Sequence, residues 1–166
     1  TTEGVSGNIP VTIPPVPTDI ATVSVNLTEK AYIKLSCTDY AVEEENENQS
    51  SITVEQGKFV SIDITIPSDE YYIKTVSIDN KEQGFSDKRK SYSNVIQANK
   101  DVEIKVTVVR DFTVTTNANE GGTIKLNNSK VSEIIKEDGR KESSQKIEEN
   151  SEVSVGVEAN DGYYIS

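Results

Sequence analysis

The chain has 166 residues and a formal net charge of −11 at pH 7, from 28 acidic and 17 basic residues. This length allows one or two small domains. The negative charge argues against a nucleic-acid partner, because phosphates bind to positive surfaces. His, Met and Trp are absent and Cys37 is the only cysteine, so an ordinary Ser-His or Cys-His catalytic pair and an intrachain disulfide are excluded. No run of 18 apolar residues occurs, so we expect no membrane insertion.

Four of the five prolines lie in residues 1–19, which predicts a Pro-rich linker or extended N-terminal segment, because Pro fixes φ and lacks an N–H donor. The sequence then alternates between β-branched and polar residues, a pattern that predicts an all-β fold of mainly antiparallel, half-buried strands. Residues 131–138 predict at most a short helix. The residues that share one face of each expected strand are Val23, Val25 and Leu27; Val60, Ile62, Ile64 and Ile66; and Val102, Ile104, Val106 and Val108.

Two parts of the chain resemble each other and indicate an internal repeat. The first two matches need a shift of 91 residues, the third a shift of 93 and the last a shift of 92. The aligned pairs are "TVSVNL" (22–27) with "TVTTNA" (113–118), "YIKL" (32–35) with "TIKL" (123–126), "ITVEQGKFVSIDI" (52–64) with "QKIEENSEVSVGV" (145–157), and Tyr-Tyr-Ile at 71–73 with Tyr-Tyr-Ile at 163–165.

This repeat predicts a first module over 20–110 and a second over 111–166, joined by a short link at a nearly fixed angle. It places Gly57 opposite Asn150, and these residue types adopt positive φ most readily, so we expect equivalent tight turns. The second copy has no counterpart of residues 97–109. We therefore expect it to be truncated at its C-terminal end, with an uncovered apolar face, and to come from a longer array. The expected equivalent core residues are Val60, Ile62 and Ile64 in the first module and Val153, Val155 and Val157 in the second.

The segment "VEQGKFVSIDITIPSDEYYIKTVSIDN" (54–80), with "GGTI" (121–124) and "DGYY" (161–164), resembles bacterial repeat modules of the internalin B-repeat family, including its divergent forms. The resemblance implies tandem β-grasp-like or small β-sandwich modules in secreted or cell-wall-attached proteins of Gram-positive bacteria, without catalytic residues. The sequence departs from the family pattern at Glu70, where a Gly is usual, and residues 81–99 are not covered.

Candidate partner-binding residues lie in one basic segment and among the tyrosines. The segment "SDKRKSYS" (86–93) is the one basic cluster in an acidic chain, and it is expected as a hairpin tip that either meets an acidic partner or is simply solvated. The tyrosines either stack on sugars or serve the core, and neighbouring rings of each Tyr-Tyr pair are expected on opposite strand faces. The candidate residues are Lys88, Arg89, Lys90, Tyr92, Tyr40, Tyr72 and Tyr164.

The acidic run at 43–48 is expected as a solvated loop, since its spacing does not fit a calcium-binding loop. No cofactor or metal site is expected. Segments 38–50, 81–96 and 127–143 are expected as loops of unequal length. Such loops favour a binding module over a pure spacer. The resemblance to bacterial surface repeats then implies a non-catalytic extracellular module whose partner is a host protein or glycan, such as an immunoglobulin or mucosal glycoprotein. The alternatives are a spacer that displays other domains and, less favoured, a carbohydrate-binding module of a polysaccharide-degrading complex.

Overall fold

The computed structural model describes residues 19–166 apart from 128, 131–133, 136 and 138–139, and every regular element in this part is a β-strand. The all-β prediction is therefore confirmed. No described segment forms a helix that is long and apolar enough to cross a membrane. The strands are β1 (Ile20–Cys37), β2 (Tyr40–Glu55), β3 (Phe59–Thr65), β4 (Tyr71–Ile78), β5 (Lys81–Arg89), β6 (Ser91–Gln97), β7 (Val102–Ala118), β8 (Gly122–Leu126), β9 (Ser129–Lys130), β10 (Ile134–Ile135), β11 (Lys141–Glu148) and β12 (Val155–Ala159).

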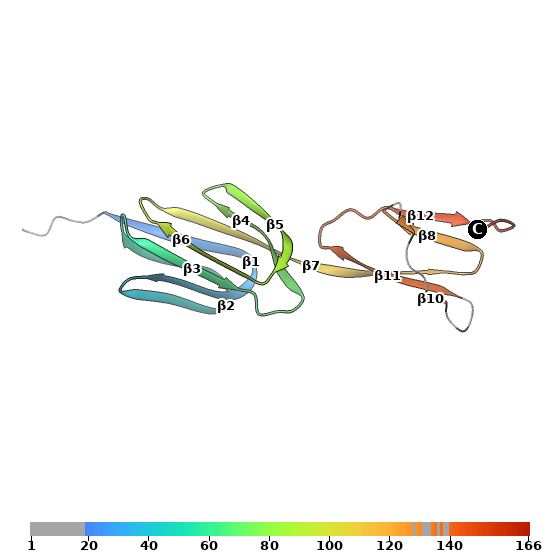
Figure 1. Ribbon diagram of the computed structural model, residues 1–166, viewed down its shortest axis with the longest axis horizontal. Coiled ribbons are helices and arrows are strands. Elements are labelled where there is room, and N and C mark those ends of the chain that lie inside the picture. The colour runs from blue at the N-terminus through green and yellow to red at the C-terminus, as the bar shows by residue number, and fades with distance from the viewer. Residues whose placement is uncertain (1–18, 128, 131–133, 136, 138–139) are drawn as a thin grey trace, which may run out of the picture.

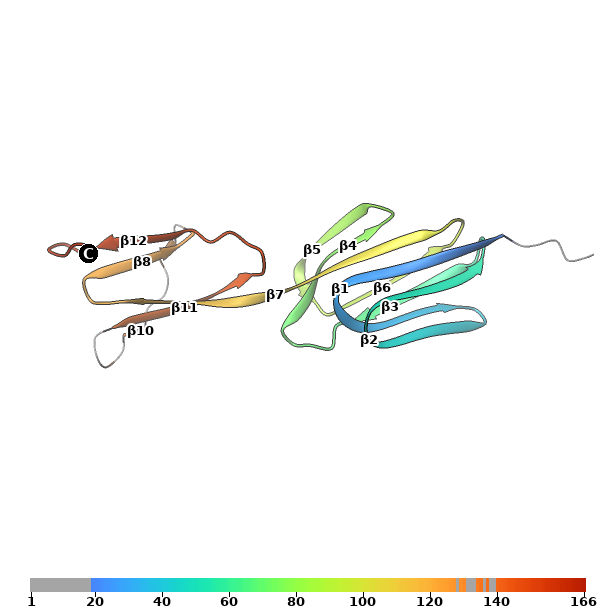
Figure 2. The ribbon, with the colours of Figure 1, turned by 180° about the vertical axis from the view of Figure 1, so that it is seen from behind.

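The molecule is elongated and has two halves, and β7 runs from one into the other (Figure 1). The view from behind shows the same arrangement, with β1 to β6 gathered in one half and β8 to β12 in the other (Figure 2). We call these the first half and the second half, and the place where β7 passes between them the junction. Because β7 is paired on both sides of Arg110-Asp111, the two halves are joined without an irregular linker.

The first half is built around β1, which pairs antiparallel with β2 along most of its length. The N-terminal part of β1 also pairs in parallel with β7, and its C-terminal part pairs antiparallel with β3. Farther out, β6 pairs with β3, and β4 pairs with both β5 and β7. On the side of β1 that does not face β2, the neighbour is β7 along the N-terminal part and β3 along the C-terminal part. The strand β1 is therefore shared by two layers, one with β7 and β4 and the other with β3 and β6.

A bend in β1 makes this change of layer possible. The pairing of β1 with β2 shifts register between Asn26 and Ile33. At the bend, the Thr28 hydroxyl donates a hydrogen bond to the Val108 carbonyl oxygen at 3.0 Å and accepts one from the Val108 N–H at 2.8 Å. A side chain thus satisfies backbone groups of β7 at the bend, as buried polar groups require.

The apolar faces expected from the alternation form the core of the first half. None of the eleven residues on the three predicted faces is more than 8% exposed. The side chains from β1, β3 and β7 belong to one hydrophobic cluster. Period-two alternation therefore identified the buried face of each of these strands correctly.

In the second half, the C-terminal part of β7 pairs with β11, and β10 extends that sheet. The chain turns at Asn119, whose side-chain oxygen accepts a hydrogen bond from the Gly121 N–H at 3.1 Å. It then enters a separate sheet, in which β8 pairs with β12 and β9.

The strand registers of the two halves correspond. Ladder β7–β11 pairs Asp111 with Glu148, and ladder β1–β2 pairs Ile20 with Glu55, so the partners are related by shifts of 91 and 93 residues. Ladder β8–β12 pairs Leu126 with Val155, and ladder β1–β3 pairs Leu35 with Ile62. The same shifts of 91 and 93 residues relate these partners. These shifts equal the ones read from the sequence.

The turns predicted at Gly57 and Asn150 are confirmed. Both residues have positive φ, 89° and 63°. Each turn is closed by the same type of hydrogen bond, from the Lys58 N–H to the Glu55 carbonyl at 3.2 Å and from the Ser151 N–H to the Glu148 carbonyl at 3.1 Å. Gly and Asn were therefore good signals for these positions.

The predicted core residues of β12 are not buried. Val155 is 59% exposed and Val157 52% exposed, whereas Ile62 and Ile64 at the matching positions of β3 are at most 1% exposed. Val153 is half-buried. The reason is a missing neighbour: β6 pairs with the outer edge of β3, and no described strand pairs with the corresponding edge of β12.

Two predicted loops are strands. Most of 38–50, including the acidic run, belongs to β2, and nearly all of 81–96 belongs to β5 and β6. The two segments are mostly polar and give the core only a few side chains, such as Tyr92, which is why side-chain alternation did not reveal them as strands. The predicted loop 127–143 lies partly outside the described residues. Of the predicted helix at 131–138, residues 134 and 135 form β10 and most of the others fall outside the description. The predicted N-terminal linker 1–19 lies outside it except for Asp19.

Candidate functional site

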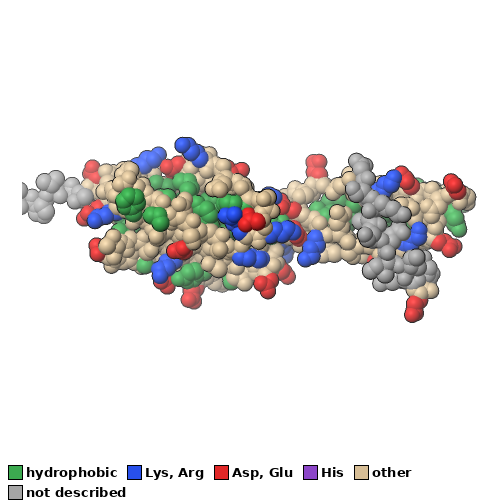
Figure 3. Space-filling model, in the orientation of Figure 1, with side chains coloured by type: hydrophobic (Ala, Val, Ile, Leu, Met, Phe, Trp, Pro, Cys, Tyr) green, Lys and Arg blue, Asp and Glu red, His purple; other side chains and the backbone are tan. Residues whose placement is uncertain are grey.

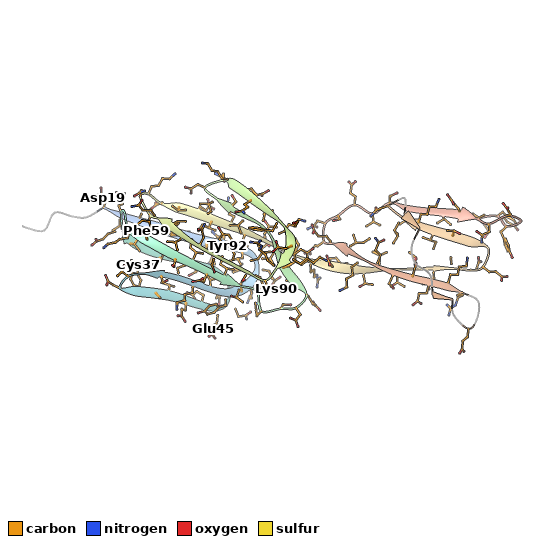
Figure 4. All side chains as sticks on the ribbon, in the orientation of Figure 1. Asp19, Cys37, Glu45, Phe59, Lys90 and Tyr92 are labelled. Atoms are coloured by element: carbon orange, nitrogen blue, oxygen red, sulfur yellow. The ribbon has the colours of Figure 1, made fainter. Side chains whose placement is uncertain are left out.

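The basic residues predicted as a binding cluster lie at the end of the first half that faces the junction, where Figure 4 labels Lys90. Lys90 links β5 to β6, and its ammonium group donates hydrogen bonds to the backbone carbonyls of Ser68 at 3.0 Å, Asp69 at 2.8 Å and Tyr71. An ammonium has three donors, and all three have partners here. Lys90 therefore holds the β3–β4 connection in place.

Arg89 is also engaged within the chain. Its guanidinium lies 3.7 Å from the centre of the Phe85 ring, a cation–π contact, and forms an ion pair with Asp87 at 3.0 Å. Tyr92 is 8% exposed and belongs to the core, with its ring 6.3 Å from that of Phe85. These side chains stabilise the first half, so the predicted solvated hairpin tip is not what this segment forms.

Tyr72 is the centre of a polar cluster at the junction. Its hydroxyl oxygen lies 2.9 Å from a carboxylate oxygen of Asp111 and 2.9 Å from one of Glu148. Lys74 forms an ion pair with Glu148 at 2.9 Å, and Lys88 forms one with Asp111. We call these five residues the junction cluster. Tyr72, Lys74 and Lys88 come from β4 and β5 in the first half, and the two carboxylates from β7 and β11 in the second.

The electrostatics of the junction cluster agree with this geometry. The hydrogen bond from Lys88 lowers the pKa of Asp111, with a further contribution from the Tyr72 hydroxyl, while burial acts in the opposite direction. Lys74 and Tyr72 lower the pKa of Glu148 in the same way. Burial raises the pKa of Tyr72 above its ordinary value, and its bonds to the two carboxylates raise it further. At neutral pH both carboxylates are therefore ionised and the phenol is protonated.

The tyrosines named as candidate partner-binding residues have different environments. Tyr72 is 5% exposed and Tyr71 is half-buried, so the inward ring of this pair is Tyr72. Tyr40 is 48% exposed, and its hydroxyl donates a hydrogen bond to the Thr53 carbonyl at 2.6 Å. Tyr164, which the repeat aligns with Tyr72, is 87% exposed. The candidate rings therefore do not form one continuous platform.

A cleft of about 560 Å³ opens beside the junction cluster. Basic side chains gather around the narrow waist of the molecule in Figure 3. Arg110 lies there over both aromatic rings that flank it, 5.5 Å from the ring centre of Tyr71 and 4.5 Å from that of Phe112. The residues that line the cleft are Asp69, Glu70, Tyr72, Lys88, Lys90, Arg110, Asp111, Phe112, Thr113 and Lys146.

The acidic run at 43–48 lies along β2. Lys34 on β1 pairs with Glu43 at 3.1 Å, and Glu45 points away from the body of the first half (Figure 4). Among the described residues, no group of three or more Asp, Glu, Cys or His side chains is arranged to hold a metal ion. The run is thus the solvent face of a strand.

Sequence reasoning missed Lys74, Asp111 and Glu148, because each is an ordinary charged residue in a chain rich in charge. One signal was available. The repeat places Asp111 at the position of Ile20, so a charge replaces an apolar residue where the modules meet.

A comparison of the chain with protein-family models, curated proteins and solved structures found no match. The relationship to the internalin B-repeat therefore stays a prediction.

Proposed function

We propose that this chain is a non-catalytic extracellular module of a bacterial surface protein, and that it acts as a rigid spacer that displays a neighbouring domain. The observation that carries the proposal is the junction. One strand, β7, continues through it with pairing on both sides. A spacer needs resistance to bending between its modules, and a continuous paired strand supplies it.

The junction cluster adds to this resistance. Bending at Arg110-Asp111 would separate Tyr72 and Lys74 from Glu148, and so remove hydrogen bonds of 2.9 Å from ionised groups. The backbone contributes as well, because the Glu149 N–H donates to the Arg110 carbonyl at 2.8 Å. Charge-assisted hydrogen bonds are stronger than neutral ones, so several favourable contacts must break together before the halves can tilt.

A surface-display experiment tests the spacer function. The chain is placed between a cell-wall anchor and an N-terminal epitope, and binding of a bulky antibody to intact bacteria is measured. Insertion of Gly-Ser-Gly between Arg110 and Asp111 should reduce antibody binding, because a flexible junction lets the epitope approach the wall. The same insertion between Asp79 and Asn80, in the β4–β5 turn, is the control and should leave binding unchanged. Equal antibody binding for all three proteins would contradict a spacer role.

A second candidate function is binding of an anionic host glycan or protein at the junction. The observation that favours it is the cleft, where Lys88, Lys90, Arg110 and Lys146 line the wall together with Phe112, which is 44% exposed. In this candidate function, the partner binds beside the junction rather than on the loops. Sulfated and sialylated glycans are the probes. Binding should fall in Lys146→Ala and Phe112→Ala but not in Lys58→Ala, which lies in the β2–β3 turn. No binding at low ionic strength would rule this candidate out.

A further inference from the structure

We propose that the second half is an acceptor for an extended polypeptide segment that supplies two successive strands, with the chemistry of residues 91–110 of this chain. This interaction is distinct from the spacer role and does not depend on it. It follows from comparing the two halves position by position, since their ladders share a register. Among the residues that the structure describes, three elements of the second half have no counterpart of the partner that the matching elements of the first half have.

The first such element is the outer edge of β12. Asn127 donates its N–H to the Ser154 carbonyl and Asn160 donates its N–H to the Gly121 carbonyl, so the backbone groups of Ser154 and Asn160 face β8. Alternation along an antiparallel ladder then turns the backbone groups of Val155 and Val157 outward. No described residue pairs with them. In the first half, the outward edge of β3 pairs with β6 over residues 91–97.

The second element is the free edge of β7 beyond the junction. Residues 111–118 pair with β11 on one side, and no described strand pairs with their other side. The matching part of β1 pairs in parallel with residues 102–106, joining Val23 to Val102 and Val25 to Ile104. The consequence is visible in burial. Val23 and Val25 are at most 1% exposed, whereas Val114 and Thr116 at the matching positions are only half-buried.

The third element is the segment Tyr163 to Ile165, whose three side chains are 54%, 87% and 66% exposed. Its counterpart at 71–73 is the start of β4, which pairs with residues 108–110 of β7. All three unpartnered elements therefore correspond to elements that bind one continuous stretch of the first half, residues 91–110. In the first half, this stretch contributes β6 to the layer that contains β3 and the first part of β7 to the layer that contains β4.

The occupant follows from this correspondence. Its first strand runs antiparallel to β12 and its second runs parallel to β7, as β6 and β7 do in the first half. It presents β-branched residues at every second position, like Val102, Ile104 and Val106, and these side chains cover the exposed faces of Val155 and Val157. Main-chain hydrogen bonds supply binding, and the alternating side chains supply selectivity, as in strand addition generally. Exposed edges of this type readily accept a strand.

A peptide with the sequence of residues 91–110 is the probe, and amide hydrogen exchange of the whole protein is the measurement. At a peptide concentration ten times the Kd, the outward amides of β12 and the free-edge amides of β7 should exchange roughly tenfold more slowly, because only about one acceptor in eleven is then free. The control peptide has Asn in place of Val102, Ile104 and Val106, and it should protect neither edge.

Two variants make the test specific. Val157→Pro removes an outward N–H while the β8 pairing is kept, so it should abolish protection, whereas Gly156→Ala leaves the outward donors intact and should bind normally. If Val157→Pro disturbs the second half, a peptide N-methylated at alternate residues tests the same hydrogen bonds on an unchanged protein. Protection of β1 and β3 instead would mean strand exchange in the first half and would overturn the proposal. Protection of both edges by self-association without peptide would overturn it too.

Discussion

At the scale of single residues, the Tyr72 hydroxyl shows how the halves are held together. It has one proton and lies 2.9 Å from two ionised carboxylates, so it can donate to only one of them at a time. Two neighbouring carboxylates would repel each other, and the shared proton together with Lys74 and Lys88 offsets that repulsion. Removing the hydroxyl therefore removes the group that connects the carboxylates of β7 and β11.

Replacing Tyr72 with Phe should lower the free energy of unfolding by about 1.5–3 kcal/mol, the range expected when a hydrogen bond to a charged group is lost. Tyr40→Phe is the matched control. Its hydroxyl bonds to a backbone carbonyl at an exposed position, so the change should stay within about 0.5 kcal/mol. Urea denaturation measures both. Equal effects of the two substitutions would show that the junction cluster does not stabilise the molecule.

The residue pair Ile62 and Val155 tests burial in the same direct way. Ile62→Ala should cost about 2–5 kcal/mol, as for other fully buried aliphatic side chains. Val155→Ala, at the matching position of the second half, should change stability by less than about 0.5 kcal/mol because the side chain is 59% exposed. Thermal unfolding compares them. A cost below about 0.5 kcal/mol for Ile62→Ala would mean that the strand register is wrong.

At the scale of elements, two turns of the same type use different residues to connect β2 to β3 and β11 to β12. Gly57 has no Cβ, whereas Asn150 bears a side chain in the left-handed region that only a few residue types tolerate. Both turns precede a strand that pairs with β1 or with β8. Turn chemistry thus sets the strand pairing in both halves, and substitutions there should act on whole ladders.

Gly57→Ala should destabilise the protein by about 1–2 kcal/mol, because a Cβ is disfavoured at positive φ. Asn150→Gly should be neutral or stabilising, since Gly adopts the same φ without strain. The midpoint of thermal unfolding for each variant checks this. A destabilised Asn150→Gly protein would indicate that the Asn150 side chain does more than occupy the turn.

The junction cluster should also make stability depend on pH at both extremes. The folded state lowers the pKa of Asp111 and Glu148, so their contribution is present above the ordinary carboxyl values and is lost as the pH falls through about 4. The folded state raises the pKa of Tyr72, so its contribution is present below about pH 10 and is lost above it.

Denaturation of the wild-type protein and of Glu148→Gln from pH 3 to pH 11 measures this dependence. The difference between the two proteins should be largest at neutral pH and should shrink below about pH 4, because Glu148 is protonated first in the unfolded state and only at lower pH in the folded state. Above about pH 10 the wild-type protein should lose stability as Tyr72 ionises on unfolding. A difference that stays constant down to pH 3 would contradict the assigned ion pair.

At the scale of the whole molecule, the sequence predicted the strands with strict apolar alternation and missed the mostly polar segments, even where one of them buries a core side chain such as Tyr92. Val60, Ile62 and Ile64 were identified because alternation reports burial directly. The 38–50 part of β2 and the 81–96 segment that forms β5 and most of β6 were taken for loops, because their mostly polar residues carry little such signal and their pairing depends on distant strands. The repeat supplied the correct register, but it could not show that Val155 lacks a neighbour.

The candidate site was harder to predict for a related reason. Lys88 and Lys90 were noticed as a local run of charge, yet their partners lie far away in sequence, at Asp111 and at Ser68 and Asp69. Such contacts depend on the tertiary fold, which a single sequence does not display. The exchange of Ile20 for Asp111 between the copies was the one feature that pointed to the junction.

The central claim is that the two halves behave as one rigid body at neutral pH. Residual dipolar couplings of backbone amides, measured in a weakly aligned sample, test it most directly. A single alignment tensor should fit the couplings of the first half and the second half together, because β7 and the junction cluster fix their relative orientation. Two tensors that differ clearly in magnitude would show independent tumbling and would contradict the account.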